Sequence, residues 1–221
     1  MAALSPTHNE QSSSRLISFS DGVVAIAITL LVLPLVDIRL PDATQDPEAA
    51  TNPLGFIWSQ NSSLISSFVV SWLVIFVFWL AHHRVFSDIP RINGPIVRFN
   101  ALWLMAIVVL PFPTSLLGQG AEPARQTIAF YIGTMLVISL CLTLITREAR
   151  RHPELTSDKP ETTSALGNPR TWGFSAYLAL MFVVAIVFGE PAMYGLLGLA
   201  LVGPASEWLH KRQLARQGLN R

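Results

Sequence analysis

An aspartate stands near the start of the first long apolar stretch of the chain, RLISFSDGVVAIAITLLVLPL at residues 15–35. A carboxylate inside a membrane-spanning helix costs roughly a few kcal/mol unless it faces partners or water. Ser18 lies three residues before Asp21 on the same helical face, and Arg15 lies two turns below. Two roles for Asp21 stay open: a cap near the membrane surface, or a member of a polar network between helices.

Two further apolar stretches bring polar side chains to the same depth. Trp79 and His82 stand near the end of SWLVIFVFWLAHHRVF and share a helical face. Asn100 stands near the start of VRFNALWLM, level with Asp21 and His82. Three helices thus each place a polar or ionisable group at one level, which predicts an internal hydrogen-bonded network.

The adjacent histidines His82 and His83 form a poor metal chelate. They point in different directions, and no cysteine or carboxylate stands at ligand spacing. We expect one imidazole in a buried hydrogen bond and the other beside Arg84 at the headgroups. The chain also lacks a P-loop and the hydrolase, zinc-protease and dinucleotide signatures. We therefore predict neither an enzyme, nor a tightly bound metal, nor an organic cofactor.

An apolar stripe follows the aspartate on the same helix. Ile26, Thr29, Leu30 and Leu33 lie within an arc of about 100° at 3.6 residues per turn. Asp21 lies about 140° away from Ile26, so the charge and the stripe face different partners. Taken alone, the stripe is also compatible with ordinary helix packing or lipid contact.

The composition predicts an all-α membrane protein. Of 221 residues, 51% are hydrophobic and 13% charged, and a bilayer crossing takes about 20 apolar residues. Six stretches qualify. Their predicted bounds are 16–36, 64–82, 97–117, 125–146, 171–188 and 191–209. Pro111 and Pro113 should break or kink the third helix in its outer third.

The loop charges predict the orientation of these six helices. The connections between helices 1 and 2, 3 and 4, and 5 and 6 hold only Arg39 and Arg125 of the 15 basic residues. By the positive-inside rule both termini are cytoplasmic, and this rule also accounts for the scattered arginines without nucleic-acid binding. The first fourteen residues lack a signal-peptide pattern. Cys141, the single cysteine, falls mid-span and should be an apolar filler.

The segment RLISFSDGV resembles the Arg-x-x-x-Phe-Ser-Asp signature of the endolysosomal potassium channel transmembrane protein 175 and its six-helix prokaryotic homologues. Arg15, Phe19, Ser20 and Asp21 occupy the signature positions. The resemblance continues through residues 67–86 and 99–118, and so covers about the first half of the chain. The later helices are similar only in hydropathy.

The resemblance implies a potassium-permeable cation channel without a Thr-Val-Gly-Tyr-Gly filter, a string that is absent from this sequence. In that family the first helix lines the pore. By position, Ile26, Leu30 and Leu33 would form the constriction, with Thr29 as the neighbouring hydroxyl and K⁺ in transit near Ile26, Thr29 and Leu30. The family's interhelical network would correspond to Arg15, Asp21, Trp79, His82 and Asn100. We expect Ser18, Phe19 and Ser20 to belong to the same structural network.

Stoichiometry follows from geometry, because one helix cannot enclose an aqueous path and several copies must converge. Animal members look like two six-helix repeats per chain, assembling as dimers, so this single repeat should form a homotetramer in the cell membrane. Its expected partners are its own copies, lipid and monovalent cations. Two alternatives stay open: a proton-coupled transporter using Asp21 and His82, and a non-conducting membrane scaffold.

Overall fold

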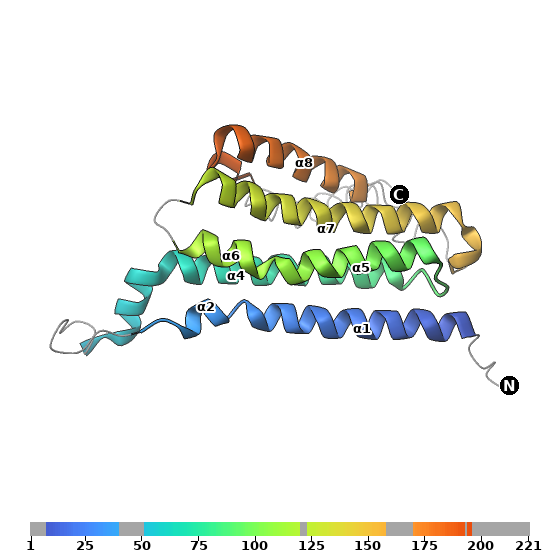
Figure 1. Cartoon of the computed structure of the whole chain (residues 1–221), viewed down its shortest axis with the longest axis horizontal. Coiled ribbons are helices and arrows are strands. Elements are labelled where there is room, and N and C mark those ends of the chain that lie inside the picture. Colours follow the sequence, from blue (N-terminus) through green and yellow to red (C-terminus); the bar gives the residue numbers. More distant parts are fainter. Residues whose placement is uncertain (1–7, 40–50, 120–122, 158–169, 193, 196–221) are drawn as a thin grey trace, which may run out of the picture.

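The computed structural model describes residues 8–39, 51–119, 123–157, 170–192 and 194–195, and all the regular structure among them is helical (Figure 1). This confirms the all-α class. The helices are α1 (His8–Leu30), α2 (Leu33–Val36), α4 (Pro53–Phe86), α5 (Gly94–Val109), α6 (Pro111–Gly118), α7 (Arg125–Arg151) and α8 (Arg170–Phe188), with a 3₁₀ turn, η1 (Pro153–Leu155).

Within the described part of the chain, four helical stretches are long and apolar enough to cross a membrane, in keeping with a multi-pass membrane protein. They are Ser12–Val36, Pro53–Phe86, Gly94–Gly118 and Arg125–Arg151. The apolar part of α8, Gly173–Phe188, is shorter than a span. Beyond Gly195, the predicted sixth span at 191–209 lies outside the described residues.

The second helix is much longer than predicted. We expected residues 64–82, but α4 runs from Pro53 to Phe86. Two helical segments meet within the polar run SQNSS at 59–63, where Asn61 has non-helical backbone angles (φ −126°, ψ 19°) and makes a kink. The Asn61 amide donates to the Ile57 carbonyl at 3.1 Å. This bond satisfies a backbone acceptor next to the kink.

The first span is interrupted near its outer end. Pro34 has no N–H, so the Leu30 carbonyl cannot accept the usual bond from four residues on. The backbone tightens just before this point, where the Val32 N–H donates to the Thr29 carbonyl at 3.2 Å, three residues back. The interruption separates α1 from the single turn of α2.

The prolines of the third span divide it as the sequence predicts. α5 ends at Val109 and α6 begins at Pro111. α6 then passes very close to α4 at Gly118, where a Cβ atom would lie 2.7 Å from the Leu64 Cα. Only glycine permits that approach between the two backbones.

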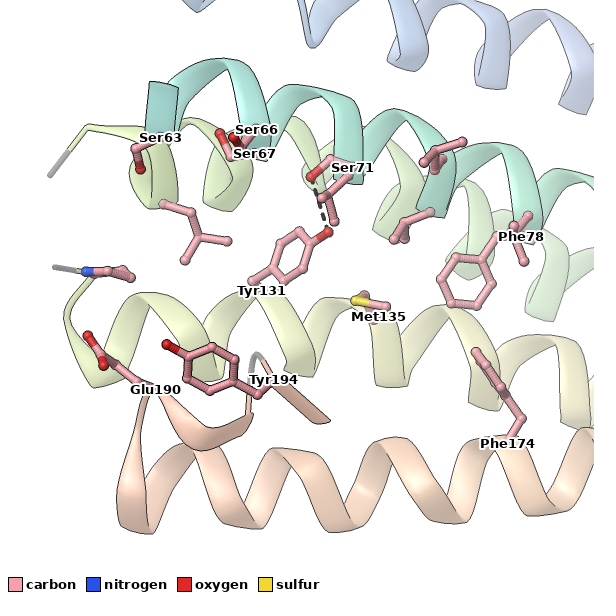
Figure 2. A pocket seen from close by; sticks show the side chains of 16 residues that line it. Ser63, Ser66, Ser67, Ser71, Phe78, Tyr131, Met135, Phe174, Glu190 and Tyr194 are labelled. Carbon is pink, nitrogen blue, oxygen red and sulfur yellow. Dashed lines mark hydrogen bonds between the residues drawn. The ribbon is translucent and has the colours of Figure 1, made fainter. Parts of the chain in front are cut away.

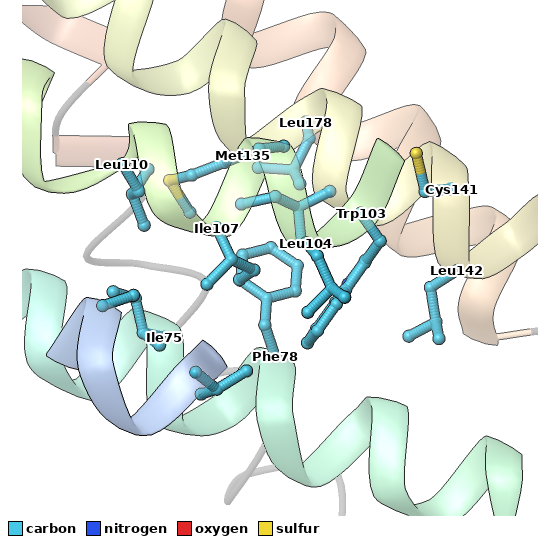
Figure 3. Packing of buried hydrophobic residues seen from close by; sticks show 14 of the residues in the cluster. Ile75, Phe78, Trp103, Leu104, Ile107, Leu110, Met135, Cys141, Leu142 and Leu178 are labelled. Carbon is cyan, nitrogen blue, oxygen red and sulfur yellow. The ribbon is translucent and has the colours of Figure 1, made fainter. Parts of the chain in front are cut away.

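The apolar core gathers on α5 and α7, around Trp103, Ile107 and Met135 (Figure 3). In α7 61% of the most apolar stretch is buried, against 22% in the first span and 17% in α4. Cys141 is 2% exposed, as expected of an apolar filler. α1 runs along one edge of the bundle (Figure 1), so one side of it has no neighbour among the described residues.

Candidate pore-lining face and polar network

The helix α1 has one buried and one exposed face. Ser20, Val24 and Ala27 are each at most 2% exposed and pack against the bundle. On the opposite side the exposed fractions of Ile26 and Leu30 are 60% and 36%, and that of Leu33, in α2, is 54%. The structure therefore brings the predicted stripe together on the side of the first span that no described helix covers.

Thr29 adds one polar atom to this exposed face. Its hydroxyl donates to the Ile26 carbonyl at 2.7 Å, so the hydrogen is engaged with the backbone. The lone pairs of Oγ1 remain available to a cation. The face thus combines bulky apolar side chains with one hydroxyl oxygen. Such an arrangement can exclude water and still contact a partly dehydrated ion.

The buried side of α1 joins the predicted polar network through Ser20. The Asn100 amide nitrogen donates to Ser20 Oγ at 3.0 Å, and Ser20 Oγ donates to the Leu16 carbonyl at 2.8 Å. Asn100 Oδ1 lies 2.7 Å from His82 Nε2. Because the amide nitrogen points to Ser20, Oδ1 must accept, which assigns a proton to His82 Nε2. Three helices, α1, α4 and α5, are linked by one directed chain of hydrogen bonds.

Trp103 is a member of this cluster that the sequence analysis missed. It is fully buried, and its ring stacks on His82 at 4.2 Å between centroids, with Phe86 at 4.3 Å from the same imidazole. Trp103 stands three residues after Asn100, on the same helical face, and this spacing could have revealed it. His82 Nδ1 and Trp103 Nε1 have no hydrogen-bond partner among the described residues. A second proton on His82 would therefore lack an acceptor there.

Asp21 forms a separate connection from α1 to α4. Its Oδ1 accepts from the Trp79 indole nitrogen at 2.8 Å. Although Trp79 and His82 stand one turn apart, they bond to different partners, and Asp21 and His82 do not contact each other by a described hydrogen bond. His83 is exposed, with its ring 5.7 Å from that of Trp79. The structure thus shows two adjacent links where we expected one network.

Three residues predicted for the network lie on exposed parts of α1. Arg15 and Ser18 are exposed, and Phe19 is 63% exposed. The predicted contact of Ser18 with Asp21 is not formed, because the Ser18 hydroxyl donates to the Ser14 carbonyl at 3.0 Å. A serine within a helix commonly satisfies itself in this way. Within one chain, the link from α1 to α5 is made by Ser20 instead.

A second polar cluster, which the sequence did not indicate, lies between α4, α6 and α7. The Thr114 hydroxyl is 2.9 Å from Ser71 Oγ, which is 3.1 Å from the Tyr131 hydroxyl. This cluster borders a cavity of about 610 Å³, which is lined by a row of α4 serines and by aromatic side chains of α7 and α8 (Figure 2). No residue of α1 lines this cavity. It is therefore distinct from the exposed face of α1.

Residues 15–111 match the family of the endosomal/lysosomal potassium channel TMEM175, and this range holds both the exposed face and the polar network. A potassium channel of Chamaesiphon minutus is 33% identical over 183 residues, covering 79% of this chain and 87% of its own. The chain belongs to the TMEM175 family. It is a prokaryotic-type member.

Other TMEM175 relatives cover less of their own length. A potassium channel of Streptomyces collinus is 36% identical over 131 residues, which is 60% of that protein. The zebrafish endosomal/lysosomal proton channel TMEM175 is 28% identical, over 27% of its length. The crystal structure of a lysosomal potassium-selective channel TMEM175 homologue from Chamaesiphon minutus superposes with a TM-score of 0.68 and 26% identity, covering 87% of this chain and 96% of that one. These relatives are named as potassium channels or as a proton channel.

Proposed function

We propose that this protein is a homotetrameric potassium-permeable channel whose constriction is the exposed face of the first span. The observation that carries the proposal is this face: Ile26, Leu30 and Leu33 are 36–60% exposed while the opposite side of the same span is buried. A single chain does not enclose a path, so four copies would place these faces around one axis. We propose K⁺ as the permeating ion because two relatives are named as potassium channels.

In this proposal, permeation depends on the width of the pore and on whether water fills it, and not on a cage of backbone carbonyl oxygens. Rings of Ile26 and Leu30 would close the path by contact and dewetting. The Thr29 oxygens would replace part of the hydration shell of K⁺. Because few ligands contact the ion, we expect modest selectivity for K⁺ over Na⁺.

The polar network holds the pore helix in this proposal and does not conduct. Ser20 and Asp21 tie α1 to α5 and α4 through Asn100 and Trp79. These contacts fix the rotation of α1 about its own axis, and that rotation determines which side chains reach the pore. By the positive-inside rule, both termini and the Arg15 end face the cytoplasm, and the Pro34 end faces outward across the cell membrane.

Reversal potentials of the purified protein in planar bilayers test the proposed function. With K⁺ and Na⁺ gradients at symmetrical pH, the proposal expects steady currents whose reversal potential follows the K⁺ gradient. Currents that require a proton gradient would point to a proton-coupled transporter instead. Electrical silence of correctly assembled protein would point to a scaffold.

A further inference from the structure

Asp37 stands at the outer end of the exposed face of the first span. It lies four residues after Leu33, across the single turn of α2, and so about 40° from Leu33 around that turn. The structure agrees, because Leu33 is 54% exposed and Asp37 is exposed just beyond the span that ends at Val36. The apolar stripe is thus followed directly by a carboxylate.

The structure of the helix end does not explain this carboxylate. Asp37 is the C-terminal cap of α2, where the helix dipole disfavours a negative charge. No salt bridge to Asp37 is formed within the described parts of the chain. Its basic neighbour Arg39 lies beyond the end of the helix, two residues further along the chain. Asp37 and Arg39 both border a hollow of about 590 Å³ with Gln60 and Asn61 of α4.

We propose that Asp37 is the cation-concentrating residue at the outer mouth of the pore, so that four copies form a ring of carboxylates one turn beyond Leu33. This inference rests on the proposed tetrameric channel. A ring of negative charge raises the local concentration of monovalent cations before they enter the apolar constriction. The effect weakens as the Debye length falls from about 30 Å at 0.01 M salt to about 3 Å at 1 M.

Single-channel conductance at low and high KCl tests this role. For D37N we expect the conductance in about 0.01 M KCl to fall roughly two- to fivefold, with no difference from the wild type in about 1 M KCl. The control is R39Q, which removes a charge of the opposite sign two residues away and should raise the low-salt conductance by a smaller factor. A rise in R39Q as large as the fall in D37N would overturn the assignment of Asp37 to the pore.

Charged reagents attached to a cysteine at position 37 provide a second measurement, because the charge is changed after the channel has folded. Cys141 is the single cysteine and is buried, so D37C can be modified selectively in a C141A background. Attaching a sulfonate should restore the low-salt conductance, and attaching a quaternary ammonium should reduce it further. A conducting wild type with unaffected D37N and unaffected D37C adducts would overturn this inference alone. A silent wild type would overturn the channel as well.

Discussion

The two ionisable side chains that first draw attention, Asp21 and His82, each form a hydrogen bond within the chain. Asp21 accepts from Trp79, and His82 donates to Asn100, which in turn donates to Ser20. Neither side chain lies on the exposed stripe. In our account these groups fix the position of α1, and the ions pass along plain apolar residues on its other side.

Asn100 should contribute most to this network because it is bonded on both sides. Replacing it with leucine leaves His82 Nε2–H without an acceptor, which costs about 1–3 kcal/mol, and breaks the bond to Ser20 Oγ, worth about 1 kcal/mol more. Ser20→Ala breaks only the bond from the Asn100 amide and keeps the His82–Asn100 bond, so it should cost less, about 1 kcal/mol. Thermal unfolding in one detergent measures both variants. N100L as stable as S20A would contradict the directed chain of bonds.

The Asp21–Trp79 bond should behave as an independent contact. Trp79→Phe removes the indole donor but keeps an aromatic ring, so we expect a loss of about 1.5–3 kcal/mol, the usual value for a hydrogen bond to a charged group. Because the Ser20–Asn100 bond still fixes the rotation of α1, the K⁺/Na⁺ permeability ratio of the assembled protein should stay unchanged. A changed ratio in W79F with unchanged thermal stability would place this pair in the conduction path.

At the scale of helices, the sequence predicted the elements that carry local signals. Pro111 and Pro113 marked the division between α5 and α6, and the 3.6-residue spacing of Ile26, Leu30 and Leu33 placed them on one face. The helical segment at residues 53–63 could not be predicted, because this stretch contains polar residues that are typical of loops. The segment is separated from the rest of α4 by a kink at Asn61. Long-range partners such as Ser71, Thr114 and Tyr131 have no sequence signal at all.

The close passage of α6 over α4 gives a prediction for a glycine. Gly118→Ala would place a Cβ 2.7 Å from the Leu64 Cα and 2.8 Å from Ser67 Oγ, so the helices must separate. We expect a loss of about 1–3 kcal/mol, as in other overpacked sites. Gly173→Ala is the control, since nothing lies within 4 Å of its Cβ position. Equal thermal stability of the two variants would mean that α6 does not pack on α4 as described.

At the scale of the whole molecule, the proposed pore needs further copies of the first span. The exposed face of this span is apolar along most of its length, and one helix face does not surround a path. We expect native mass spectrometry of the protein in lipid nanodiscs to give four times the mass of one chain. A monomer in both detergent and lipid would exclude a pore made from copies of α1.

The most direct test of the central claim, that the α1 stripe is the constriction, compares two equally exposed apolar positions. Ile26 is 60% exposed on α1, and Val77 is 56% exposed on α4. In planar bilayers, I26N should raise the conductance or lower the K⁺/Na⁺ permeability ratio, because an amide hydrates the narrowest point of the pore. V77N should leave both quantities unchanged. If I26N conducts with wild-type conductance and permeability ratio, the constriction is not formed by this face.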